Sequence, residues 1–182
     1  MSFEEVNILN NIIAIGIIIL GISSLLLSLE LFGIKILPKK IKSFMTKNLL
    51  WIGFSVSLGA MAFSMIYSTV VGYPPCDLCW YQRIFMYPLV FIFGMMALKK
   101  EYESRGLWVL GRNLSFVGIT IAIYQNLITW FDVSSICSSG SDCTKLLVNS
   151  FGFVTIPLMS FVGFLFLIVL FYWNKNFRSS LG

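Results

Sequence analysis

Long stretches of apolar residues constrain this chain more than any other feature. A helix of about 20 apolar residues crosses the roughly 30 Å hydrocarbon core of a bilayer. Five stretches approach or exceed that length and take up most of the 182 residues: Val6–Phe32, Leu49–Val71, Ile84–Leu98, Leu114–Phe131 and Phe151–Trp173. The third is the shortest, with 15 residues, so we expect its helix to begin earlier, near Cys79. The pattern predicts an all-α integral membrane protein.

Composition agrees with a membrane protein and argues against several classes of function. Charged residues make up 12% of the chain, about half of the roughly 25% that is typical of soluble domains. The net charge of +5 could suggest a nucleic-acid partner. The basic residues lie mainly in short connections between apolar stretches, however, so we expect contact with membrane lipid and not with nucleic acid. The chain has no histidine and so lacks the commonest metal ligand and the usual general base near neutral pH.

Lysine and arginine predict which connections lie in the cytoplasm, because basic connections are retained there. Gly33–Asn48, Lys99–Arg112 and the tail at residues 174–182 are basic. We therefore expect a plasma-membrane protein with these three segments, and the C-terminus, in the cytoplasm. The connections Gly72–Arg83 and Asp132–Ser150 are then expected outside.

The N-terminal stretch is expected to be an extra transmembrane helix. Met1–Asn7 has two glutamates and no basic residue, which places the N-terminus outside. Val6–Phe32 lacks the positive leading segment and cleavage site of a signal peptide and is too long for one. An interfacial helix is the alternative. The expected divisions are residues 1–48, with the extra helix and a basic loop, residues 49–173, the main membrane domain, and residues 174–182, a cytoplasmic tail.

All four cysteines lie in the two connections expected outside: Cys76, Cys79, Cys137 and Cys143. Disulfides persist in that compartment, and two pairs on one side of a membrane can pass a disulfide between them by thiolate attack. The alternatives are two structural disulfides and a zinc site. A bridge across so short a loop constrains the unfolded chain little. Zinc modules usually space two pairs by about 15–20 residues, whereas 57 residues separate Cys79 from Cys137.

Arg83 follows the first pair at a spacing that suggests a role. If a helix begins near Cys79, Gln82 and Arg83 lie at i+3 and i+4 from it, on the same face. A guanidinium there favours a thiolate and could donate hydrogen bonds to a carbonyl oxygen of a cofactor. The alternative is an arginine that anchors the helix end at the headgroups.

A thiol pair outside cannot oxidise partners repeatedly unless an acceptor removes its electrons. The sequence has no histidine for haem, no nucleotide-binding loop and no cluster-like run of cysteines. By elimination, a lipid-soluble quinone is the acceptor that fits best, and menaquinone and ubiquinone are both open.

The stretch C-x-L-C-W-Y-Q-R-I-x-M-Y-P-L at Cys76–Leu89 closely resembles the hallmark of the disulfide bond formation protein B (DsbB) family, in particular its BdbC-like branch. The resemblance continues through Cys137 and Cys143 into GFVTIPLMS at Gly152–Ser160 and covers roughly Leu49–Trp173. In bacteria the DsbA–DsbB–quinone route keeps the periplasm oxidising.

The resemblance implies a membrane thiol oxidase with a four-helix core, so that the N-terminal helix is additional to a four-helix transmembrane bundle. It implies that Cys137 and Cys143 form the bridge that oxidises a thioredoxin-fold partner, DsbA- or BdbD-like. Cys137 would be the site of the mixed disulfide. Cys76 and Cys79 would reoxidise this pair, and Cys79 would face the quinone.

Two further residues are implied, and two features depart from the family pattern. Arg83 matches the arginine associated with the quinone site, and Gln82 is its neighbour in the motif. The loop pair has only five residues between Cys137 and Cys143, whereas the best-known bacterial members space these cysteines widely. Residues 1–48 lie outside the resemblance, and a membrane anchor or packing helix is the simplest expectation for them.

Two other functions stay open from the sequence. A vitamin K epoxide reductase-like protein also couples cysteine pairs to quinone, but there the loop pair precedes the C-x-x-C, and here it follows. A non-enzymatic membrane scaffold or transporter subunit with structural disulfides is the other alternative. Charges within the membrane would support a transporter, and the apolar stretches hold essentially none.

Overall fold

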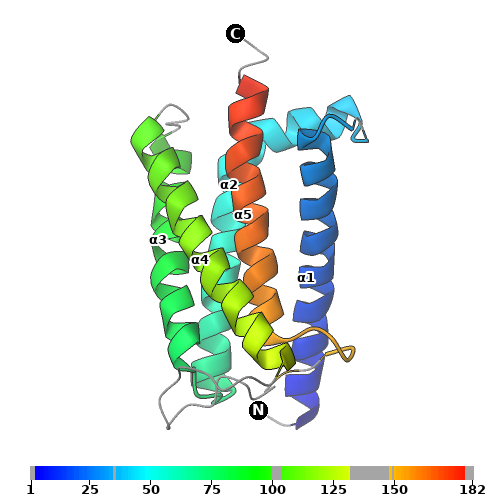
Figure 1. Ribbon diagram of the computed structural model, residues 1–182, viewed down its shortest axis with the longest axis vertical. Coiled ribbons are helices and arrows are strands. Elements are labelled where there is room, and N and C mark those ends of the chain that lie inside the picture. Colours follow the sequence, from blue (N-terminus) through cyan, green and yellow to red (C-terminus); the bar gives the residue numbers. More distant parts are fainter. Residues whose placement is uncertain (1–2, 35, 100–103, 132–147, 149, 179–182) are drawn as a thin grey trace.

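The computed structural model describes residues 3–34, 36–99, 104–131, 148 and 150–178, and of Phe3 and residues 175–178 it describes the backbone alone. The described chain is built from helices (Figure 1). They are α1 (Phe3–Leu31), α2 (Lys39–Met65), the π-helical turn η1 (Ile66–Val70), α3 (Asp77–Lys99), α4 (Arg105–Phe131) and α5 (Ile156–Arg178).

Within the described residues, five helices are long and apolar enough to cross a membrane. This confirms the prediction of an all-α membrane protein with an extra N-terminal helix. We call the two ends of the bundle the cysteine end and the lysine end. At the cysteine end α1 begins, η1 ends and α3 begins, and at the lysine end α1 ends, α2 begins and α5 ends (Figure 1).

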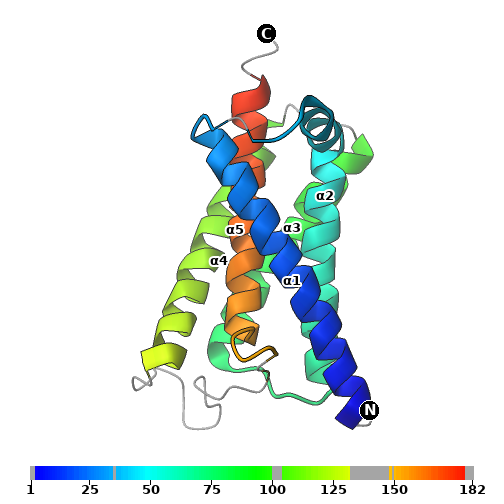
Figure 2. The ribbon, with the colours of Figure 1, turned by 90° about the vertical axis from the view of Figure 1, so that its right-hand side faces the viewer.

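α5 is the central helix of the bundle. It packs against α1, α2 and α4, while α3 packs between α2 and α4. Most residues of the buried core come from α3 and α5, where Leu89, Phe93, Phe164 and Leu167 are completely buried. α1 crosses α5 obliquely on the outside of the bundle (Figure 2).

Gly118 allows α4 to approach α5 closely. A Cβ atom at this position would overlap the aromatic ring of Phe164. Any larger residue would therefore displace a ring that belongs to the central core.

The helices do not begin where the apolar stretches begin. α2 begins at Lys39 and not at Leu49, because Pro38 ends the preceding turn with an extended conformation (φ −65°, ψ 149°) and the basic residues after it continue the helix beyond the apolar part. α4 likewise begins at Arg105, before the stretch at Leu114. α3 begins at Asp77, close to the position expected from the short third stretch.

The last helix begins later than the apolar stretch predicted. Phe151 and Gly152 both have positive φ (54° and 79°) and form a turn, so α5 begins at Ile156 and not at Phe151. The Thr155 hydroxyl accepts a hydrogen bond from the Leu158 N–H (3.4 Å) and caps this helix. Pro157 consequently lies in the first helical turn, where its missing N–H needs no partner.

Candidate active site at the cysteine end

The first cysteine pair lies at the start of α3. Cys76 directly precedes the helix, and its sulfur accepts a hydrogen bond from the backbone N–H of Cys79 (3.4 Å), as an N-cap side chain does. Both thiols are free, and their sulfur atoms are 2.7 Å apart. Because the N-terminus of a helix carries a partial positive charge, it favours negative charge on this pair.

The two thiols occupy different surroundings. Cys76 is buried and packs in a small cluster with Ile128 of α4, whereas Cys79 is partly exposed. The contact with the Cys79 sulfur, followed by burial, raises the pKa of Cys76 well above its ordinary value. When the pair loses one proton, Cys76 therefore keeps the other.

Gln125 of α4 contacts both sulfur atoms, and the sequence analysis missed it. Its side-chain Nε2 lies 3.3 Å from the Cys76 sulfur and 3.6 Å from the Cys79 sulfur. Its Oε1 accepts a hydrogen bond from Gln82 Nε2 (2.8 Å), which fixes the amide so that its N–H groups point at the thiols. One signal was available: a Gln-Asn pair within an apolar stretch is expected to face the interior.

Gln82 therefore does more than neighbour Arg83 in the motif. It is 6% exposed, and its hydrogen bond to Gln125 connects α3 to α4 beside the sulfurs. Among the predicted site residues, the structure brings Cys76, Cys79, Gln82 and Arg83 together.

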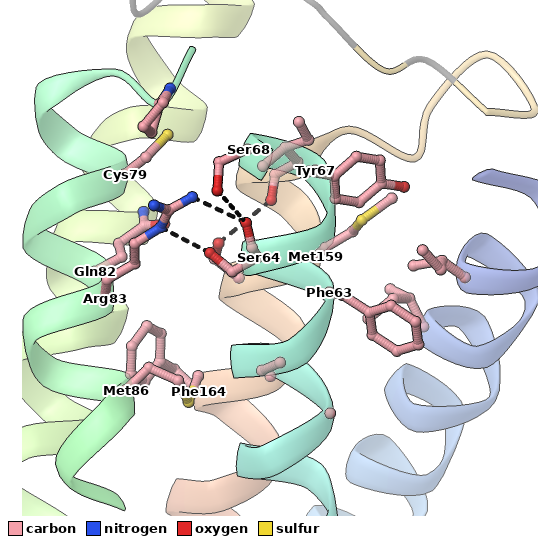
Figure 3. Close-up of a pocket in the computed structure, with 18 of the residues that line it drawn as sticks. Phe63, Ser64, Tyr67, Ser68, Cys79, Gln82, Arg83, Met86, Met159 and Phe164 are labelled. Carbon is pink, nitrogen blue, oxygen red and sulfur yellow. Dashed lines mark hydrogen bonds between the residues drawn. The ribbon is translucent and has the colours of Figure 1, made fainter. Parts of the chain in front are cut away.

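Arg83 points inward between α3 and α2 (Figure 3). Its Nε donates to the Ser64 hydroxyl (2.8 Å) and its terminal nitrogen to the Ser64 carbonyl (3.0 Å). Its guanidinium carbon also lies 5.0 Å from the centre of the Trp80 ring, within cation–π range. An arginine that only anchored the helix end would extend toward the headgroups, and this side chain, 9% exposed, does not.

Ser64 lies in the last turn of α2. The π-helical turn at Ile66–Val70 follows directly, and the Ser68 hydroxyl also donates to the Ser64 carbonyl (3.1 Å). π-helical turns are often found at functional sites. No feature of the sequence indicated this turn, so Ser64 and Ser68 were not predicted.

A cavity of about 350 Å³ lies between α1, α2, α3 and α5. Its polar lining residues include Cys79, Gln82, Arg83, Ser64 and Ser68, which gather near the cysteine end. Of the two described cysteines, Cys79 alone lines it, and Figure 3 shows Cys79 and Arg83 on the side of α3 that faces α2. Most of the remaining wall is apolar, so the cavity combines an apolar lining with a few polar groups, as small-molecule sites do.

The second cysteine pair, Cys137 and Cys143, lies outside the described residues. The chain is described up to Phe131, at the end of α4, and again at Val148. Val148 is buried at the cysteine end, where it packs in a cluster with Ile13 and Tyr67. Both attachment points of the intervening segment are therefore at the same end of the bundle as Cys76 and Cys79.

Comparisons with known proteins agree with the resemblance read from the motif. The profile of the family described as "Disulfide bond formation protein DsbB" matches residues 46–174. "Probable disulfide formation protein C 2" of Bacillus anthracis is 42% identical over 126 residues, which cover 68% of this chain and 88% of the relative. "Disulfide bond formation protein C" of Bacillus subtilis (strain 168) is 35% identical over 123 residues, 66% of this chain and 87% of the relative.

A third relative comes from a different genus. "Probable disulfide formation protein" of Oceanobacillus iheyensis is 40% identical over 130 residues, which cover 68% of this chain and 86% of the relative. No solved structure matches the chain. The family match spans well over half of the sequence, and this chain therefore belongs to the DsbB family of membrane disulfide bond formation proteins.

Proposed function

We propose that this protein is a quinone-dependent thiol oxidase. It takes electrons from a thioredoxin-fold partner outside the plasma membrane and delivers them to menaquinone or ubiquinone in the bilayer. The observation that carries the proposal is the position of Cys79, which lines the same cavity as Arg83 while its partner Cys76 lies behind it, against α4.

The exchange begins with a disulfide between Cys76 and Cys79. A thiolate of the Cys137/Cys143 pair attacks the Cys76 sulfur, a new S–S bond forms there, and Cys79 leaves as a thiolate. The second thiol of the loop pair then displaces Cys76, so that the loop pair is oxidised and Cys76/Cys79 is reduced. The Gln125 amide, which contacts both sulfurs, stabilises the negative charge that develops on the leaving sulfur.

The cavity has the features that a quinone site needs. A bound quinone would supply a two-electron acceptor, and two electrons and two protons convert it to the hydroquinone while Cys76 and Cys79 return to the disulfide. Arg83 is held by Ser64 at the cavity wall and retains N–H groups that can donate to a ring carbonyl oxygen. The apolar wall accommodates the rest of the ligand.

The loop pair completes the path of electrons. We propose that Cys137 forms the mixed disulfide with a DsbA- or BdbD-like partner and that Cys143 resolves it. The segment of residues 132–147 is attached at both sides to the cysteine end, which supports transfer to Cys76 over a short distance. This scheme requires the cysteine end to face the outside and the lysine end the cytoplasm.

Turnover of the purified protein tests the proposal. The full chain in nanodiscs is mixed with a reduced thioredoxin-fold protein that has a C-x-x-C pair, and absorbance follows reduction of an added quinone. We expect quinone reduction in proportion to partner oxidation, and its loss in Cys79→Ser. The control is Thr120→Ala, an exposed position on α4 that does not line the cavity. Undiminished turnover in Cys79→Ser would remove the basis of the proposal.

Labelling of intact cells tests the orientation separately. After mild reduction, a membrane-impermeant maleimide should label Cys137 and Cys143, while a cysteine introduced at Lys47, at the lysine end, should react only after the cells are opened. The opposite pattern would place the cysteine end in the cytoplasm and contradict the electron path.

A further inference from the structure

We propose that α1 is a wall of the cofactor cavity and binds the apolar chain of the quinone there. The inference rests on the proposed function for the identity of the ligand. α1 lies outside the family match, which begins at residue 46. It is therefore an addition to the region that the matched family shares.

One face of α1 lines the cavity. Ile13, Gly16, Ile17 and Leu20 are its lining residues, and the spacing i, i+3, i+4 and i+7 puts them on one side of a helix. Ile19, which lies elsewhere on the helix, is 60% exposed at the outer surface. The lining face of α1 has no polar side chain, in contrast to the walls from α2 and α3.

Contacts at both ends hold α1 in this position. Near the cysteine end, Asn10 Oδ1 accepts a hydrogen bond from the Tyr67 hydroxyl (2.8 Å). Near the lysine end, Glu30 forms an ion pair with Lys42 and accepts a hydrogen bond from the Leu37 N–H (3.0 Å). Between these ends α1 packs against α5. The helix is therefore fixed against the bundle and is more than a membrane anchor.

The polar and apolar parts of the cavity wall match the two parts of a quinone, its ring and its isoprenoid chain. A quinone ring near Cys79 and Arg83 finds hydrogen-bond donors on α3 and α2. Its isoprenoid chain needs an apolar surface that continues from the same site, and the face at Ile13–Leu20 provides it. Without α1, this side of the cavity between α2 and α5 would open to lipid.

Gly16 provides a way to change this wall alone. A Cβ atom built at Gly16 meets nothing within 4 Å. Because Gly16 lines the cavity, a leucine there would extend into its space and leave the packing against α5 intact. Ile19→Phe is the matched control, since it enlarges a side chain on the exposed surface of the same helix.

The test is photolabelling of the full chain in nanodiscs with a ubiquinone analogue that has a diazirine in its apolar chain. Mass spectrometry then locates the label, a readout that needs no turnover. We expect label within Ile13–Leu20 in the wild type and in Ile19→Phe. In Gly16→Leu, labelling should fall and the Kd of the chain-bearing quinone should rise about tenfold, whereas the Kd of a chain-free quinone should change less than about threefold.

The outcomes separate this inference from the proposed function. Label confined to α2, α3 and α5 would overturn the inference, and so would a Gly16→Leu variant that weakens both quinones equally. Label on α1 in a wild-type protein that reduces no quinone would support α1 as the chain-binding wall and refute the quinone-dependent activity. The wild-type labelling decides the question even if Gly16→Leu fails to fold.

Discussion

Replacing Gln125 should change the redox potential of the Cys76/Cys79 pair in a direction that the geometry fixes. Leucine has a similar size to glutamine but cannot donate hydrogen bonds. In Gln125→Leu both sulfurs therefore lose the amide that lies 3.3 and 3.6 Å away. Gln82 also loses its acceptor, which lowers stability in both redox states and so cancels in the potential.

The magnitude follows from the charge on the reduced pair. A hydrogen bond to a charged group contributes about 1.5–3 kcal/mol, and one between neutral groups about 0.5–1.5 kcal/mol. At a pH where the reduced pair bears a thiolate, Gln125 favours this reduced form over the neutral disulfide by the difference, about 1–2 kcal/mol. Since about 1.4 kcal/mol corresponds to 30 mV for a two-electron couple, the variant should be about 20–40 mV more reducing.

The assay isolates this pair by replacing Cys137 and Cys143 with alanine. The protein is equilibrated with known ratios of reduced and oxidised dithiothreitol, and free thiols are counted by mass after alkylation. Asn126→Leu is the control, because Asn126 is also buried on α4 but its amide donates to the Ala122 carbonyl (2.7 Å). A Gln125→Leu potential equal to the wild type, or more oxidising, would refute the reasoning.

Three further predictions follow from the same contacts. Arg83→Lys cannot keep both hydrogen bonds to α2, so steady-state kinetics should show a quinone KM higher by about tenfold or more; an unchanged KM would argue against a ligand contact. Gly118→Ala should lower the free energy of unfolding by about 1–3 kcal/mol, because its Cβ overlaps Phe164. Thermal unfolding in detergent measures this, and Gly106→Ala, which meets open space, should have no such cost. Cys79→Ser should oxidise a single equivalent of partner and then stop, as thiol trapping would show; continued turnover would contradict the order of transfer.

The sequence was sufficient to predict the spanning helices and to place Cys79 and Arg83 on one side of α3. Apolar length alone identifies spanning helices, because the bilayer thickness is fixed. The spacing of Cys79 and Arg83 places them on one helical face regardless of what packs against it. The helix limits predicted from hydropathy were less accurate than the number of helices. Basic residues such as Lys39 continue a helix beyond the residue at which hydropathy falls.

The partners of these residues could not be read in the same way. Gln125 meets the sulfurs because α4 packs beside α3, and Ser64 meets Arg83 because α2 packs on another side of α3. Neither packing angle nor turn type is encoded in a local pattern. α1 is apolar on all sides, so its periodicity did not show which face would line a cavity.

The groups of the motif lie at successive depths along α3, from the start of the helix toward the middle of the membrane-spanning segment. Cys76 directly precedes the helix and packs against Ile128 of α4, and Cys79 lies one turn further, at the cavity. Arg83 lies a further turn toward the membrane centre, where an unpaired guanidinium is costly. The two bonds to Ser64 and the contact with Trp80 offset that cost before any ligand binds. Arg83 is therefore held in place before any ligand binds, one turn beyond Cys79 on the same helix.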